Sequence, residues 1–214
     1  MHPLPLRRGV ALAILGVAAA LWLTALVGAR PAAAAPTDAE ARVNAFYGAL
    51  LDTMKQAKRL GTKGRYERLL PVILDTFDVP GMTRLAAGSA WLTASPAQQA
   101  ELTDAFSRLM TATYAARFDD FTGEQFEIAP AVDQPPGNKL VRTRLVQSNG
   151  KIYNLNYLMR AAAGGWKIAD VYLDGTISEL AARRAEFASI IKDGGPDALV
   201  GLLRQRADKL LAGP

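Results

Sequence analysis

Carboxylates are the main side chains of this sequence that could support acid–base or metal chemistry. The chain of 214 residues contains no Cys, and its single His is His2. A Cys nucleophile, a thiolate metal site and a disulfide are therefore excluded. Six aspartates could in principle form the pairs that acid–base work or a hard cation requires: Asp75, Asp78, Asp119, Asp120, Asp170 and Asp174.

The positions of these aspartates do not favour catalysis. Asp119 and Asp120 stand at the end of a long predicted helix, where solvated acids are common. Asp170 and Asp174 flank a strand end beside Gly175, where a turn is expected. The sequence also has no glycine-rich phosphate loop and no G-x-S-x-G elbow. We therefore expect no catalytic residues, no metal and no cofactor, and we expect that the protein is not an enzyme.

The N-terminus has the pattern of a secretory signal peptide. Arg7 and Arg8 precede an apolar run over residues 9–29, and small residues lead to Ala35. We predict a signal peptide over residues 1–35, a domain over 36–214 and a periplasmic location. The alternative is an uncleaved inner-membrane anchor, because the apolar run is long enough to span a bilayer. Cleavage after Ala34 would remove His2, and with it the base of a Ser–His–Asp triad.

The charge of the chain is partly a property of this leader. The whole chain has 25 Lys+Arg and 20 Asp+Glu, a formal charge of +5. Residues 1–34 contain three arginines and no acidic residue, so the remaining chain would have a charge of +2. No basic stripe with interleaved aromatic residues remains, and we expect no nucleic-acid partner.

The rest of the chain contains segments with the residue patterns of helices and segments with those of strands. Apolar residues at three-to-four spacing predict helices over residues 38–60, 65–77, 77–87, 96–120, 177–192 and 196–211. Strand-like segments are predicted over residues 125–132, 139–147, 151–161 and 166–173, with Asn149-Gly150 and Gly164-Gly165 as hairpin turns. The order of helices, strands and helices predicts an α+β fold with a four-stranded antiparallel meander, packed by the N- and C-terminal helices.

Two-residue turns in both hairpins would set the register of the sheet. In that register Arg142 faces Tyr157, Arg144 faces Leu155, and Tyr157 faces Tyr172. One face is then aromatic with a few embedded charges, the combination that an amphiphile requires of a cavity and its mouth.

Other interpretations of these arginines stay open. Their stems could pack at a sheet edge while the guanidinium groups reach water, or Arg142 could pair with Asp170. A shift of one residue in the register would exchange the two faces.

Several motifs in order resemble the toluene-tolerance/MlaC family. They are the segment FDVPGMTRL over residues 77–85, the segment WLTASPAQQ over 91–99, the WKI-x-DV motif over 166–171, and a C-terminal block that contains Arg184 and Phe187. The resemblance covers about residues 40–211. The GTIS segment over residues 175–178 departs from the main pattern. The GTISEL segment over residues 175–180 and the Arg183-Arg184 pair look closest to the hopanoid-associated HpnM-like branch.

The resemblance implies a periplasmic lipid carrier with an apolar cavity between sheet and helices. Its partners would be a phospholipid or hopanoid lipid, an inner-membrane ABC transporter complex and an outer-membrane complex. We expect the lipid to contact Phe106, Leu109, Met110, Tyr114, Leu155, Tyr157, Met159 and Tyr172, and the headgroup to contact Arg142 and Arg144. The alternative function is a non-lipid adaptor that binds a membrane transporter or hopanoid-related machinery.

Overall fold

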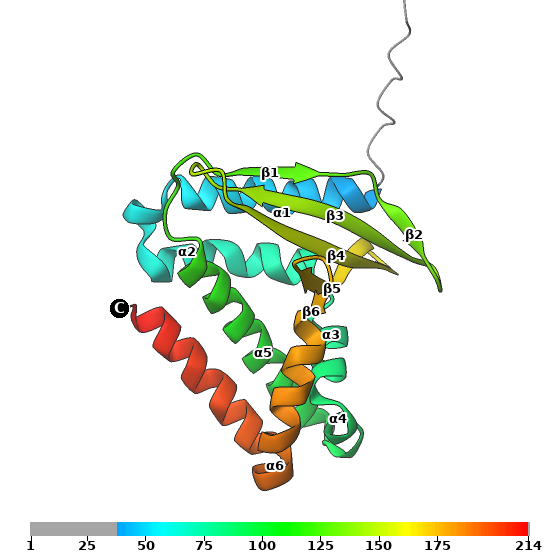
Figure 1. The fold of residues 1–214 in the computed structure, drawn as a ribbon. Helices are drawn as coiled ribbons and strands as arrows, with labels where there is room; N and C mark the ends of the chain where they lie inside the picture. The colour runs from blue at the N-terminus through cyan, green and yellow to red at the C-terminus, as the bar shows by residue number, and fades with distance from the viewer. Residues whose placement is uncertain (1–37, 214) are drawn as a thin grey trace, which may run out of the picture. The chain divides into compact units, whose positions relative to one another are not determined.

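The computed structural model describes residues 38–213, so the predicted signal peptide lies outside the described residues. The helices are α1 (Asp38–Met54), α2 (Ala57–Thr76), α3 (Val79–Ala87), α4 (Ser89–Thr93), α5 (Pro96–Arg117) and α6 (Glu179–Ala212). The strands are β1 (Gln125–Ile128), β2 (Val132–Gln134), β3 (Asn138–Val146), β4 (Ile152–Ala162), β5 (Gly165–Leu173) and β6 (Ile177–Ser178). This mixed order confirms the predicted α+β class (Figure 1).

The helices begin and end close to their local signals. The Asp78 side chain accepts a hydrogen bond from the Gly81 N–H at the start of α3. Ser95 and Gln98 form a complete capping box at the start of α5. The predicted helix over residues 38–60 is wrong in its length, because α1 ends at Met54 and α2 already begins at Ala57. Helix α6 includes both predicted C-terminal helices except residues 177–178, which form β6, and a non-helical Gly195 separates its two halves.

The sheet is larger than the predicted meander. Its strands are all antiparallel in the order β1-β3-β4-β5-β6. Strand β2 pairs with the first residues of β3, and β1 pairs with the last ones. The single strand predicted over residues 125–132 is divided, since β1 ends at Ile128 and β2 starts at Val132. Strand β6 is only two residues long, which is too short for an alternation of apolar residues to reveal it.

The predicted register of the first hairpin is wrong by one residue. The Gln147 N–H donates to the Lys151 carbonyl, and three residues, 148–150, form the loop between them. Gly150 takes a positive φ of 81°, as the last position of a three-residue hairpin loop requires. The longer loop places Arg142 opposite Asn156 and Arg144 opposite Asn154, on the other face of the sheet from Tyr157.

The second hairpin contains an irregularity that the sequence does not show. Met159 pairs with Ile168, whereas its neighbour Leu158 pairs with Asp170 and not with Ala169. One extra residue in β5 is therefore bulged out, and every later residue of β5 changes face. Val171 consequently lies on the same face as Tyr157, and Tyr172 lies on the opposite face.

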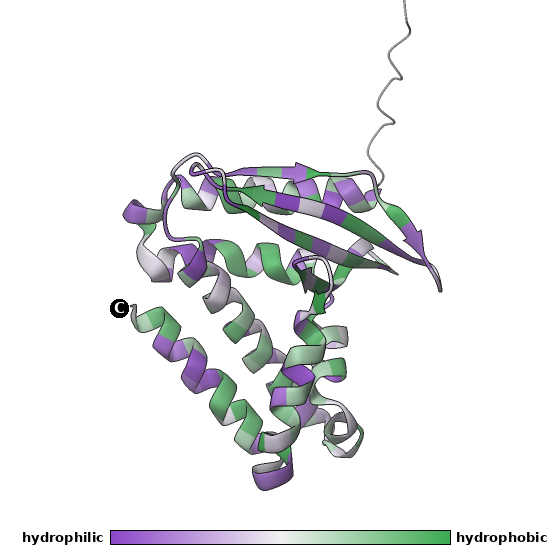
Figure 2. Cartoon of the chain, viewed as in Figure 1, coloured by the Kyte–Doolittle hydropathy of each residue, from purple (hydrophilic) through white to green (hydrophobic). Residues whose placement is uncertain are grey.

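One face of the sheet is packed by helices, and the other is more open. Tyr157, Met159 and Val141 are fully buried on the helix-covered face, whereas Arg142 and Asn154 are exposed on the opposite face. Hydrophobic and hydrophilic residues alternate along β3 and β4 accordingly (Figure 2). Helix α1 packs on β3 and β5, and α5 packs between α2 and α6 (Figure 1).

A buried carboxylate fastens the start of α6 to the sheet. Asp170 in β5 accepts hydrogen bonds from the Ser178 hydroxyl (2.6 Å) and the Leu180 N–H (3.1 Å). Ser178 in turn caps α6, since its hydroxyl oxygen accepts a hydrogen bond from the Ala181 N–H. The first turn of α6 is thereby held against the strand that precedes it. Among residues 38–213, no helix has the length and apolar character needed to cross a membrane.

Candidate functional site

An apolar pocket lies between the sheet and the helices. It encloses about 150 Å³, and its whole space, including the part open to solvent, is about 950 Å³. The helices contribute Tyr47, Leu50, Met82, Phe106, Leu109, Met110, Thr113, Tyr114, Arg117, Glu179, Leu180 and Arg183. The strands and connecting segments contribute Phe77, Phe118, Phe126, Leu155, Tyr157, Val171 and Leu173.

Helix α5 supplies one continuous wall of the pocket. Phe106, Met110, Thr113 and Arg117 follow one another at intervals of three or four residues and therefore share a face of the helix. Other sides of α5 carry small buried residues such as Ala112. Small residues permit the close packing of α5 against its neighbouring helices, which fixes the direction of the pocket-lining face.

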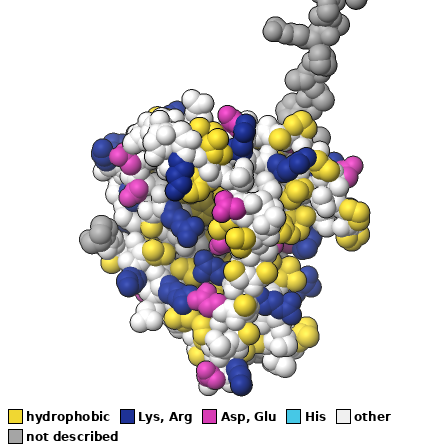
Figure 3. Space-filling view, viewed as in Figure 1, with side chains coloured by type: hydrophobic (Ala, Val, Ile, Leu, Met, Phe, Trp, Pro, Cys, Tyr) yellow, Lys and Arg dark blue, Asp and Glu magenta, His cyan; other side chains and the backbone are white. Residues whose placement is uncertain are grey.

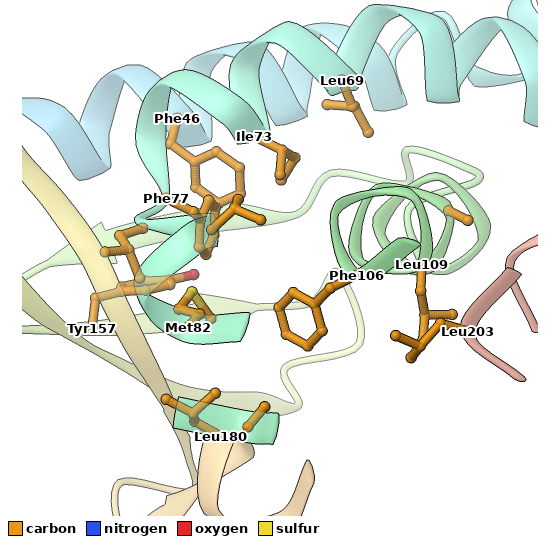
Figure 4. Packing of buried hydrophobic residues seen from close by; sticks show 14 of the residues in the cluster. Phe46, Leu69, Ile73, Phe77, Met82, Phe106, Leu109, Tyr157, Leu180 and Leu203 are labelled. Atoms are coloured by element: carbon orange, nitrogen blue, oxygen red, sulfur yellow. The ribbon is translucent and has the colours of Figure 1, made fainter. Parts of the chain in front are cut away.

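Aromatic rings surround the floor of the pocket. The ring of Phe46 lies edge-on to Phe77, with 5.3 Å between the centroids, and edge-on to Tyr114, at 5.5 Å. Tyr47 is stacked on Phe126 at 3.9 Å. Figure 4 shows Phe46, Phe77, Met82 and Tyr157 gathered on one side of α5. This packing holds the rings in defined positions around the pocket.

A short chain of hydroxyl groups is built into the apolar wall. The Thr143 hydroxyl donates to the Leu155 carbonyl (2.5 Å), and the Tyr47 hydroxyl lies 2.5 Å from the Thr143 hydroxyl. A hydrogen bond of 3.0 Å joins the Tyr47 and Tyr157 hydroxyls. The hydroxyl chain therefore begins at the backbone of β4 and ends at Tyr157, on the pocket wall.

Burial keeps the pocket tyrosines uncharged. Desolvation raises the pKa of Tyr47 to about 12, against the opposing effect of its hydrogen bonds to Thr143 and Tyr157. Desolvation likewise raises the pKa of Tyr114 and of Tyr157, and the neighbouring Tyr47 hydroxyl adds to both increases. All three side chains therefore stay protonated in any physiological environment.

Three charged residues line the pocket: Arg117, Glu179 and Arg183. Arg117 is exposed, which marks the side on which the pocket meets solvent, and Arg183 is half-buried. Neither guanidinium forms an ion pair with any other residue in 38–213, whereas Arg144 on the opposite sheet face is paired with Glu127. Figure 3 shows Lys and Arg side chains gathered near the middle of one face, with hydrophobic side chains between them.

The structure brings most of the predicted lipid-binding residues together. Those that line the pocket are Phe106, Leu109, Met110, Tyr114, Leu155 and Tyr157. Met159 is fully buried in the core beside them and does not line the pocket. Tyr172 lies on the opposite sheet face because of the bulge in β5.

The two predicted headgroup arginines do not lie at the pocket. Arg142 and Arg144 are exposed on the opposite sheet face, because the first hairpin loop has three residues. The pocket arginines, Arg117 and Arg183, lie on helices instead. The sequence holds one weak signal for Arg117, since it stands three residues after Tyr114 and so shares its helix face. Arg183 has no comparable signal, since its role depends on how α6 is fastened to the sheet.

The arrangement favours binding over chemistry. Its wall is mostly hydrocarbon, its buried hydroxyls are neutral, and of its three charged residues Arg117 is exposed while Glu179 and Arg183 are half-buried. Such a pocket suits a ligand with an apolar body and a polar or anionic end.

Comparisons with known proteins agree with this description. A family model described as MlaC protein matches residues 44–205. The fold is similar to that of a phospholipid-binding protein from Ralstonia solanacearum, solved in complex with a phospholipid. That match has a TM-score of 0.72 and 26% sequence identity, and it covers 81% of this chain and 99% of the other.

Proposed function

This chain belongs to the MlaC protein family, and from that premise we propose that it is a periplasmic carrier that holds a lipid in the apolar pocket. The observation that carries the proposal is an apolar pocket whose lining includes two arginines that form no ion pair within residues 38–213. The phospholipid bound by the structurally similar Ralstonia protein supports the same class of cargo.

The energetics explain why a lipid needs a carrier. Each buried methylene group contributes about 0.8 kcal/mol, so a chain of sixteen carbons loses roughly 12 kcal/mol when it enters water. A pocket that replaces the contacts of the bilayer lowers that barrier without any covalent step. We propose that the protein moves lipid between an inner-membrane ABC transporter complex and an outer-membrane complex.

The charges favour a cargo with an anionic headgroup. Arg117 and Arg183 form no ion pair within the described part of the chain, and a guanidinium can donate two hydrogen bonds to one phosphate. Glu179 lines the same pocket and could face the cationic part of a zwitterionic headgroup. We therefore propose a phospholipid as the cargo. A hopanoid without phosphate is the alternative that analysis of the bound lipid would reveal.

The proposal is tested by filling the pocket and extracting the bound lipid. Leu155 and Leu158 are half-buried leucines of the same strand, but only Leu155 lines the pocket. We expect Leu155→Trp to occupy the space of the cargo, whereas the matched control Leu158→Trp changes the other face of the sheet. Mass spectrometry of an organic extract should then find lipid with the native protein and the control, and little with Leu155→Trp.

Two outcomes would overturn the proposal. One is a native protein from which no lipid can be extracted and which does not take up phospholipid from vesicles, as expected of an adaptor. The other is an unchanged amount of bound lipid in a folded Leu155→Trp variant, which would move the lipid to another site. Circular dichroism of both variants establishes that they are folded.

A further inference from the structure

The pocket contains phenol groups whose hydrogen-bonding capacity the protein does not fully use. We call Tyr47, Tyr114 and Tyr157 the phenol cluster; they come from α1, α5 and β4 and line the same pocket. The rest of the lining is mainly hydrocarbon. A hydroxyl in such surroundings is stabilised by a hydrogen bond and is costly when it has none.

Tyr114 has the clearest unused capacity. Its hydroxyl forms no hydrogen bond with any other residue that the structure describes, and aromatic contacts hold its ring. Those contacts are with Phe46, at 5.5 Å between centroids, with Phe77, at 5.9 Å, and with Phe118, stacked at 5.8 Å. The ring is thus placed by packing, and its hydroxyl is available to a ligand.

The Tyr157 hydroxyl also has part of its hydrogen-bonding capacity unused. It is 2% exposed, and its hydroxyl forms one hydrogen bond within residues 38–213, to Tyr47. A phenol can donate one hydrogen bond and also accept, so Tyr157 retains one role whichever of the two oxygens donates. Figure 4 shows its oxygen pointing inward, toward Phe77 and Met82.

The phenol cluster lies close to the charged side of the pocket. Tyr114 precedes Arg117 by three residues of α5, a rise of about 4.5 Å along the helix axis. The charge of Arg117 also acts on Tyr114, opposing the increase of the Tyr114 pKa that burial causes. An anionic headgroup at Arg117 would therefore place the next atoms of the lipid beside the Tyr114 hydroxyl.

We propose that the phenol cluster is a subsite for an uncharged oxygen of the cargo, located just beneath its charged end. An ester carbonyl of a diacyl lipid and a hydroxyl on a hydrocarbon chain share this chemistry. The inference rests on the proposed function and adds a specificity to it. The pocket would bind a lipid that has an oxygen at this position more tightly than a lipid that has only hydrocarbon there.

The test compares lipids that differ only in this oxygen. One pair is a diester phosphatidylglycerol and its diether analogue with the same chains, and the other is palmitate with and without a hydroxyl on its third carbon. Each competes with a fluorescent lipid for the delipidated protein. We expect the oxygen-bearing member of at least one pair to bind roughly three- to tenfold more tightly, the effect of one hydrogen bond. The pair that responds identifies the source of the oxygen.

Phenylalanine variants assign the preference to the phenol cluster. Tyr114→Phe and Tyr157→Phe remove one oxygen each and keep the ring, so we expect them to reduce the ratio of affinities within the pair that responds. Tyr172→Phe makes the same change on the opposite sheet face and should keep the full preference. Equal binding within both pairs, or a preference that survives in both pocket variants, would overturn the inference while leaving the carrier function intact. Failure of both phosphatidylglycerols to bind would overturn the carrier function itself.

Discussion

At the scale of single residues, the pocket combines neutral hydroxyls with cationic side chains, and each kind has its own measurable signature. The tyrosines respond to alkaline pH, because burial holds them protonated. The arginines respond to the charge of the cargo.

The pKa of Tyr47 predicts a loss of stability at alkaline pH. Its value is raised from 10.0 to about 12 in the folded protein, so the unfolded chain releases this proton first. The stabilising contribution is complete below pH 10 and is lost as the pH rises toward 12, by about 3 kcal/mol for two pKa units. Urea unfolding at a series of pH values measures it. Tyr47→Phe should show a shallower decline over this interval, and Tyr153→Phe should decline like the native protein; equal slopes for all three would contradict the assignment.

The pocket arginines and the outer-face arginines should differ in their effect on lipid affinity. We expect Arg117→Gln or Arg183→Gln to weaken binding of an anionic phospholipid by roughly tenfold, as loss of a charge-assisted hydrogen bond does. The double variant Arg142→Gln/Arg144→Gln should change it little, since both residues lie on the opposite sheet face and do not line the pocket. Titration with fluorescent phosphatidylglycerol measures the affinities.

Diacylglycerol supplies the internal control for that prediction. It has the same apolar body without the phosphate, so the two pocket variants should bind it as the native protein does. An equal loss for both lipids would show that the substitutions damage the pocket itself.

At the scale of elements, the sequence predicts whether a segment is a helix or a strand better than it predicts which face of the sheet a side chain occupies. Helix α5 is predicted well because Ser95 and Pro96 start it and its apolar spacing continues for several turns. The orientation of Arg142 depends on one extra residue in the loop 148–150, and that of Tyr172 depends on one bulged residue in β5. Both features are set by tertiary pairing, and an Asn-Gly pair is compatible with either loop length.

The same reasoning applies to the candidate site. Phe106, Leu109 and Tyr114 could be predicted because they belong to one long periodic helix. Arg183 could not, because it reaches the pocket only after the Asp170 carboxylate has fixed the start of α6.

Asp170 should therefore control the wall that α6 contributes. We expect Asp170→Ala to lower the free energy of unfolding by roughly 2–3 kcal/mol, because two donors of α6 lose a charged acceptor. Amide hydrogen exchange over residues 180–183 should accelerate at the same time. Ser178→Ala removes the bond to Asp170 and the cap on the Ala181 N–H, but the Leu180 N–H keeps its bond to Asp170. Exchange of the Leu180 amide should therefore accelerate less in Ser178→Ala than in Asp170→Ala. Unchanged exchange in Asp170→Ala would show that other contacts hold the helix.

At the scale of the whole molecule, the enclosed volume of about 150 Å³ is small for a lipid. A cavity of that size holds a molecule such as benzene. A long acyl chain must therefore separate the walls, and the unbranched side chains of Met82 and Met110 can repack as the walls move.

Lipid binding should stabilise the domain by mass action. A lipid at 100 times its dissociation constant adds about 2.7 kcal/mol, which corresponds to an increase in Tm of roughly 5–10 °C for a domain of this size. Differential scanning calorimetry of delipidated and reloaded protein measures the shift. The Leu155→Trp variant should show a much smaller shift under the same conditions, and a shift equal to that of the native protein would contradict binding in the pocket.

The first half of α6 is defined at both ends by specific features. Asp170 pins it beside Leu180, and the non-helical Gly195, with φ of 70°, ends it about 21 Å farther along the axis. A tilt of about 10° at the pinned end would displace the far end by roughly 4 Å, given that length. Because the chain has no native Cys, spin labels on cysteines introduced at Asp193 and Ser148 can report this distance with and without lipid. A change in this distance on loading would mean that the position of the α6 kink depends on whether the pocket is filled.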